Sequence, residues 1–128
     1  MNNERKPWMR IAVCLAGLMG AAGMALAAAA AHAGGAERLG PASTMLLFHA
    51  CAVLGASALV DRGILNRLGV AAVFAFTLGT ALFSGDLGMR HYSNRALFTM
   101  AAPTGGTLLI VAWLMLALAA IWPARKAS

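Results

Sequence analysis

Charged residues are scarce in this chain, and their absence from long stretches is its most informative feature. Only 11% of the 128 residues are Asp, Glu, Lys or Arg, and just 4 are acidic. These charges lie between the apolar stretches, whereas a soluble helical protein carries charges along one face of each helix. A soluble all-helical protein is therefore a minor alternative, and we expect a membrane protein.

Catalytic and cofactor-binding motifs are also lacking. The chain has no phosphate-binding loop, no dinucleotide fingerprint and no nucleophile elbow around Ser84. No nucleophile is placed beside a base, as covalent catalysis requires. We therefore predict no catalytic residues and no cofactor, and we expect that the protein is not an enzyme.

Metal-binding spacing is missing as well. Zinc sites often use clustered ligands such as Cys-x-x-Cys, which do not occur here. A site formed by His32, His49, His91 and Asp86 is a minor alternative, and a haem held by His32 and His49 is a weaker one. We predict no metal site.

The chain has only two cysteines, Cys14 and Cys51. If both lie in membrane-spanning helices, their depths differ by roughly 10–15 Å at a rise of 1.5 Å per residue. A disulfide requires Cα atoms within about 7 Å. The sequence therefore predicts two free thiols, which we interpret as residues of the helical core.

Long apolar stretches dominate what remains. Hydrophobic residues make up 61% of the chain, compared with roughly 45–50% in soluble domains. A membrane-spanning helix needs about 20 mostly apolar residues, and four stretches meet this requirement: 11–32, 43–60, 68–89 and 103–122. The sequence predicts an all-α integral membrane four-helix bundle, up-down-up-down, that forms a single transmembrane domain over residues 1–128.

The distribution of basic residues predicts the orientation. With four spans, the two termini and the loop between the second and third spans lie on one side. This side has seven basic residues, and the other has three. Loops rich in Lys and Arg stay in the cytoplasm, so both termini are expected there, with the protein in the bacterial inner membrane. The net charge of +6 then serves orientation and contact with anionic lipids, and no nucleic-acid partner is expected.

The first span permits a second interpretation. Basic residues, an apolar run and Ala31-His32-Ala33 resemble a secretory signal with its cleavage site. The run is about 20 residues long, whereas the apolar region of a signal peptide usually has 7–15. Cleavage therefore remains the minor alternative.

Polar groups gather near the predicted outer ends of the spans, and they form the candidate ligand-binding site. A histidine inside a span is costly and usually has a partner, while glycines in the first turn of a helix leave N–H groups open to an anion. Structural alternatives are a neutral His49 donating a hydrogen bond between helices, and close packing of the glycine pair against the first or third span. The candidate residues are His32, His49, Ser84, Gly85, Thr104, Gly105 and Gly106.

Several of these residues fall in motifs that resemble a known family. The motifs are Ala30-Ala31-His32, Phe48-His49-Ala50-Cys51-Ala52-Val53-Leu54, Leu78-Gly79-Thr80-Ala81-Leu82-Phe83-Ser84-Gly85 and Ala102-Pro103-Thr104-Gly105-Gly106, followed by Trp113. In order and spacing the chain resembles the small bacterial inner-membrane proteins of the YgdD/YwdK type, domain of unknown function 423. The resemblance implies a four-helix membrane protein that keeps its first span, and it implies no established activity. The alanine run before His32 and Asp86 after the Ser-Gly pair depart from the family pattern.

Two functions remain open at this stage. Small size, short loops and a row of small residues at Gly17, Ala21, Ala25 and Ala29 favour a structural or accessory protein that packs against a larger membrane complex or forms a homo-oligomer. The alternative is binding or transport of a small molecule, lipid or ion at the polar site of the outer leaflet. Membrane lipids are expected partners in either case.

Overall fold

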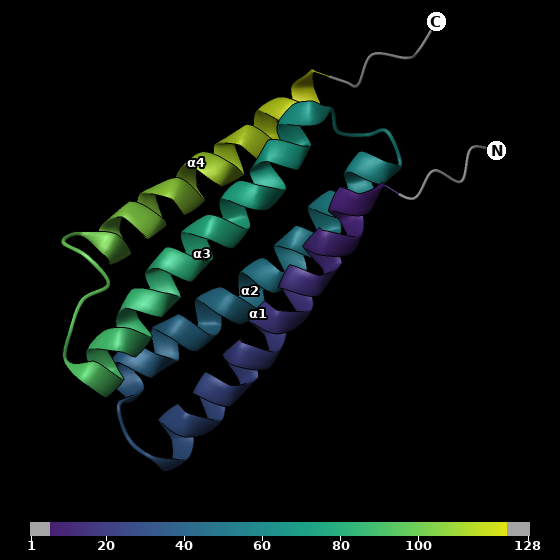
Figure 1. Cartoon of the computed structure of the whole chain (residues 1–128). Coiled ribbons are helices and arrows are strands. Elements are labelled where there is room, and N and C mark those ends of the chain that lie inside the picture. Colours follow the sequence, from purple (N-terminus) through teal and green to yellow (C-terminus); the bar gives the residue numbers. More distant parts are fainter. Residues whose placement is uncertain (1–5, 123–128) are drawn as a thin grey trace, which may run out of the picture.

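Four long helices, joined by short loops, make up the described structure. The structure, a computed structural model, describes residues 6–122, and within this range it contains no strand. Each helix is long and apolar enough to cross a membrane. The helices are α1 (Pro7–His32), α2 (Ala36–Asp61), α3 (Arg67–Ser93) and α4 (Ala101–Ile121). The predicted all-α, four-helix membrane fold is confirmed (Figure 1).

Consecutive helices lie side by side in chain order. Packing joins α1 to α2, α2 to α3 and α3 to α4, while α1 reaches α3 at only a few positions. In the described range α1 and α4 share no packing interface and lie at opposite edges (Figure 1). One end of the bundle, which we call the loop end, carries the two loops 33–35 and 94–100. The opposite end carries Lys6, the single loop 62–66 and Trp122.

Helices α2 and α3 extend beyond both ends of the predicted apolar stretches 43–60 and 68–89. Pro41 lies inside α2, which begins at Ala36, seven residues before the predicted start of the second span. Helix α3 continues to Ser93, four residues beyond the predicted end of the third span. The hydroxyls of Ser43 and Ser84, which lie within these two helices, find partners on neighbouring helices.

Glycine is required at the α1–α2 turn. Gly34 and Gly35 both have positive φ, at 82° and 83°, a backbone region that favours glycine because it has no Cβ. A side chain at Gly35 would also overlap with the imidazole ring of His91 from α3. The loop end is therefore closed by contact between the first loop and the last turn of α3.

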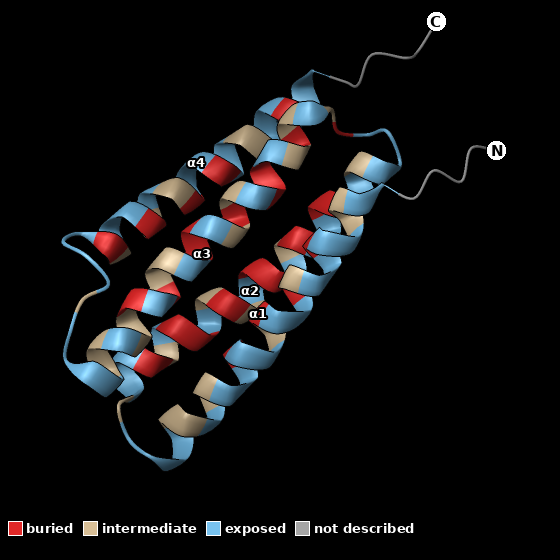
Figure 2. Ribbon diagram, in the orientation of Figure 1, coloured by how far each residue is buried: buried red, intermediate tan, exposed pale blue. Residues whose placement is uncertain are grey.

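Small and hydroxyl-bearing residues bring the helices together. The hydroxyl of Ser43 donates to the carbonyl oxygen of Gly23 at 2.8 Å, and that of Ser84 donates to the carbonyl oxygen of Ala42 at 2.9 Å. Both hydroxyls are buried and each links two adjacent helices. Buried residues follow the facing sides of the helices, and the outward sides remain exposed (Figure 2). This pattern suits helices whose outer faces contact lipid.

Candidate functional site

His49 lies at mid-height of the bundle. It is the fourteenth residue of the 26-residue helix α2, so either end of that helix is about 20 Å away. The sequence placed it about two turns from the outer end, because the predicted span began at Ser43. The error arose because α2 starts seven residues earlier, at Ala36.

His49 is only 4% exposed, and both of its ring nitrogens have hydrogen-bond partners. The indole Nε1 of Trp113 in α4 donates to His49 Nε2 at 3.2 Å. Since an indole can only donate, Nε2 must accept, and the imidazole carries its proton on Nδ1. Nδ1 then donates to the carbonyl oxygen of Met45 at 2.9 Å. His49 is thus a neutral imidazole that accepts, rather than donates, the hydrogen bond between helices.

Aromatic rings from three helices surround this hydrogen bond. Phe76 of α3 packs edge-on against Trp113 with ring centroids 4.7 Å apart, and Phe48 lies 5.4 Å from His49. Phe76 is fully buried, whereas Trp113 and Phe48 are 40% and 60% exposed. The cluster therefore has a closed inner side and an open outer side.

The open side of this cluster faces an apolar groove of about 480 Å³. Its volume lies within the roughly 300–1,000 Å³ typical of small-molecule sites. Helices α2 and α4 form its walls, and Phe83 contributes from α3. We name it the α2–α4 groove; it is lined by Thr44, Met45, Phe48, His49, Phe83, Gly106, Leu109, Ile110 and Trp113.

The other candidate residues do not join this groove. Of the seven predicted site residues, only His49 and Gly106 line it. Ser84 and Gly85 line a second groove, of about 600 Å³, between α1 and α3. His32 is exposed at the end of α1, where its Nδ1 lies 2.9 Å from the carbonyl oxygen of Ala28.

The glycine pair does not offer free N–H groups. Helix α4 begins at Ala101, so Gly105 and Gly106 lie past the first four residues, whose N–H groups a helix leaves unpaired. A Cβ at Gly105 would lie 2.7 Å from the carbonyl oxygen of Gly79 in α3. Gly105 therefore permits close contact between two backbones, which matches the structural alternative. Thr104 is exposed on α4 beside it.

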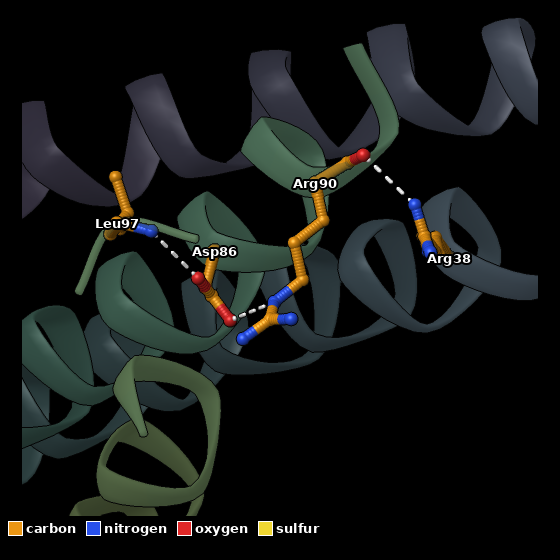
Figure 3. A network of polar contacts seen from close by, with 4 residues as sticks. All are labelled: Arg38, Asp86, Arg90 and Leu97. Atoms are coloured by element: carbon orange, nitrogen blue, oxygen red, sulfur yellow. Dashed lines mark hydrogen bonds and ion pairs between the residues drawn. The ribbon is translucent and has the colours of Figure 1, made fainter. Parts of the chain in front are cut away.

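A polar network that was not predicted from the sequence lies at the loop end (Figure 3). The carboxylate of Asp86 is fully buried and accepts from Arg90 Nε at 2.8 Å and from the backbone N–H of Leu97 at 2.9 Å. Arg38 of α2 donates through Nη1 to the backbone carbonyl of Arg90 at 2.8 Å. Asp86 thus ties loop 94–100 to α3, and Arg38 ties α2 to the same turn.

Two further predictions concern cysteines and metals. Cys14 and Cys51 are free thiols, as predicted, but both are exposed on the outer faces of their helices and not in the core. Among residues 6–122, no group of three or more His, Cys, Asp or Glu side chains is arranged to hold a metal ion.

The basic residues Arg5, Arg125 and Lys126, together with Met1 and Ser128, lie outside the described residues. The membrane orientation, which was inferred from the basic residues, therefore stays a prediction.

Comparison with known proteins gives consistent matches. The family model "Protein of unknown function (DUF423)" matches residues 19–106. The "UPF0382 inner membrane protein YgdD" of Escherichia coli strain K12 is 34% identical over 79 residues, which are 62% of this chain and 60% of that protein. The protein of the same name from Shigella flexneri matches equally. The chain thus aligns with about three fifths of the length of these relatives, and no solved structure matches it.

Proposed function

The chain belongs to the DUF423 family of proteins of unknown function, and for this inner-membrane member we propose a binding role. Its α2–α4 groove holds the hydrocarbon chain of a lipid or a similar long apolar molecule. The single observation that carries this proposal is the groove itself, apolar along its walls and partly open beside the His49–Trp113 hydrogen bond. The proposal is one of binding and not of catalysis.

The lining chemistry supports an apolar ligand. The imidazole and the indole N–H are already paired with each other and with Met45, so neither requires a polar ligand group. Phe48, Ile110 and Trp113 present exposed apolar surface. A hydrocarbon chain satisfies these groups, whereas an ion would lose its hydration without compensation.

The same pairing argues against chemistry at His49. A general base must reach the proton that it removes, but Nε2 of His49 already accepts from Trp113. The buried hydroxyls of Ser43 and Ser84 donate to backbone carbonyls, so neither is activated by a base. We accordingly propose that the protein has no enzymatic activity.

Fluorescence quenching of Trp113 tests the proposal. Replacing Trp8 and Trp122 with Phe leaves Trp113, at the wall of the groove, as the sole tryptophan. Detergent-solubilised protein is titrated with a phospholipid carrying brominated acyl chains, since bromine quenches an indole that it contacts. The expected result is saturable quenching with about one lipid bound per chain.

Substitutions at two separate glycines provide the test and its matched control. Gly106→Leu places a side chain in the groove, and a Cβ there meets only Phe83 Cδ2, at 3.8 Å. Gly55→Leu makes the same change at an exposed site of α2 where nothing lies within 4 Å of the new Cβ. Saturable quenching should disappear in the first variant and persist in the second. Quenching that rises without saturation and equally in both variants would overturn the proposal.

A role as an accessory protein is the second candidate, and the outer face of α1 favours it. Gly17 and Ala21 are exposed, and nothing lies within 4 Å of a Cβ built at Gly17. Small residues at membrane helix surfaces allow close approach of another helix. Crosslinking in native membranes from position 17, with position 55 as the control, tests this role: a specific adduct from position 17 alone supports it, and identical patterns contradict it.

We also propose the predicted orientation, with both termini in the cytoplasm. It would place the loop end on the outer side of the inner membrane. Labelling of cysteines introduced into loops 33–35 and 62–66 of a variant lacking Cys14 and Cys51 tests it in intact cells. Labelling of the first loop alone by a membrane-impermeant maleimide is expected, and labelling of the second alone would reverse the assignment.

A further inference from the structure

We propose that the ligand of the α2–α4 groove is a phospholipid and that Arg38 and Arg90 bind its phosphate. This inference rests on the proposed function, because it adds a headgroup site to a groove already assigned to a hydrocarbon chain. The observation behind it is that Arg38 and Arg90 both lie at the loop end, seven residues from groove residues of the same helices, and that Nη1 of Arg38 donates to the backbone carbonyl of Arg90. An amphiphile with an apolar chain and an anionic head matches that arrangement.

Helical spacing places both arginines above the groove. Arg90 follows Phe83 by seven residues on α3, and Arg38 precedes Met45 by seven on α2. Seven residues are close to two full turns, so each pair shares a helix face and is separated by about 10 Å along the axis. Phe83 and Met45 both line the groove. The arginines therefore lie toward the mouth of the groove at the loop end.

Asp86 draws the guanidinium of Arg90 back along α3, away from the loop end. The ion pair joins Arg90 to a residue one turn deeper in α3. Among residues 6–122, the side chain of Arg90 donates one hydrogen bond, from Nε to Asp86 (Figure 3). An arginine has five N–H donors, so the two Nη groups remain for a ligand, and 43% of the side chain is exposed.

Arg38 supplies the second cation. Its Nη1 donates to the backbone carbonyl of Arg90, whereas the guanidinium of Arg90 points the other way, toward Asp86 (Figure 3). Arginine recognises phosphate through several N–H groups at once. A phosphate at the mouth of the groove would accept from the guanidinium groups of Arg38 and Arg90 while the acyl chain enters the groove.

The acidic residues nearby define the charge balance. Asp86 is fully buried and paired with Arg90, so this pair is neutral overall: Arg90 offers hydrogen bonds to a phosphate, and Arg38 supplies the positive charge. Glu37, next to Arg38, is exposed and lies seven residues before Thr44, another groove residue. Its carboxylate is therefore also near the groove mouth and opposes an anion there. This neighbour gives a test in which two adjacent substitutions have opposite expected effects.

The experiment compares two ligands with identical brominated chains, phosphatidylglycerol and diacylglycerol, by quenching of Trp113 in the single-tryptophan protein. Phosphatidylglycerol is expected to bind more tightly because only it carries a phosphate. Arg38→Gln should weaken its binding about fivefold, the effect of removing one cation near an anionic headgroup. Diacylglycerol binding should not change. Glu37→Gln should strengthen phosphatidylglycerol binding by a similar factor, and Arg67→Gln, at the opposite end, should have no effect.

The outcomes separate this inference from the proposed function. Equal saturable binding of the two ligands, or equal losses for both ligands in Arg38→Gln, would overturn the phosphate site and leave the groove intact. Weaker phosphatidylglycerol binding in Glu37→Gln would overturn it as well. Saturable binding of neither ligand would remove the groove proposal together with the phosphate site.

Discussion

The indole of Trp113 donates to the imidazole of His49 across 3.2 Å, and this hydrogen bond joins α4 to α2 at mid-height of the bundle. Helices α2 and α4 do not share one of the main packing interfaces, because α3 lies between them. Phe76 of α3 closes the inner side of the pair. The contact thus fixes how far apart the walls of the α2–α4 groove lie.

Removing this hydrogen bond should weaken the bundle. Trp113→Phe keeps an aromatic ring but leaves His49 Nε2, within a side chain only 4% exposed, without its donor. Hydrogen bonds between membrane helices average about 0.6 kcal/mol, with a maximum near 1.7 kcal/mol. We expect a loss in that range in reversible unfolding in detergent. Trp122→Phe, at an exposed position, is the control, and equal stability of the two variants would contradict the role of the contact.

Gly105 and Gly106 should respond in opposite directions to substitution by alanine. At Gly105 the new Cβ would lie 2.6 Å from the backbone nitrogen of Phe83, so α3 and α4 must separate, at a cost of about 1–3 kcal/mol. At Gly106 the Cβ has space, and alanine is the better helix former by about 0.8–1.0 kcal/mol. Thermal unfolding should therefore rank Gly106→Ala at or above the native chain and Gly105→Ala below it. The reverse order would disprove the close contact.

The buried carboxylate of Asp86 should be needed for the loop end. In Asp86→Asn one side-chain atom can still accept from Leu97, but the amide nitrogen would then face Arg90 Nε, donor against donor. The lost charge-assisted hydrogen bond predicts destabilisation of about 1.5 kcal/mol. Asp61→Asn, which removes an exposed 3.7 Å ion pair with Lys6, should cost less than about 0.5 kcal/mol. Similar losses in both variants would show that the network adds nothing beyond a surface ion pair.

The sequence predicted the four helices because hydrophobicity alone determines where a chain can cross a membrane. It placed the start of the second helix seven residues late, because Pro41 looks like a helix boundary in isolation. In the fold, Pro41 is tolerated within α2, and Ser84 is satisfied by a carbonyl of the adjacent helix. The local sequence does not distinguish a polar residue that contacts another helix from a polar residue that ends a helix.

The candidate site was predicted only in part, for a similar reason. A histidine within a span indicates a partner, and the partner is Trp113, which lies 64 residues away. The indole N–H of Trp113 also needs an acceptor when it is half-buried. No motif in the local sequence, however, indicates that this acceptor is His49. The spacing of Asp86 and Arg90, four residues apart on one helix, was a readable signal for an ion pair. The contact of Arg38 was not predictable, because it depends on how the first turn of α2 packs against the last turn of α3.

Native mass spectrometry of the protein extracted in mild detergent tests the lipid groove most directly, because it counts retained lipids on each chain. We predict one retained phospholipid on the native chain and on Gly55→Leu, and none on Gly106→Leu, whose side chain occupies the groove. Retention of the same lipid by all three proteins, or by none of them, would contradict a binding site between α2 and α4.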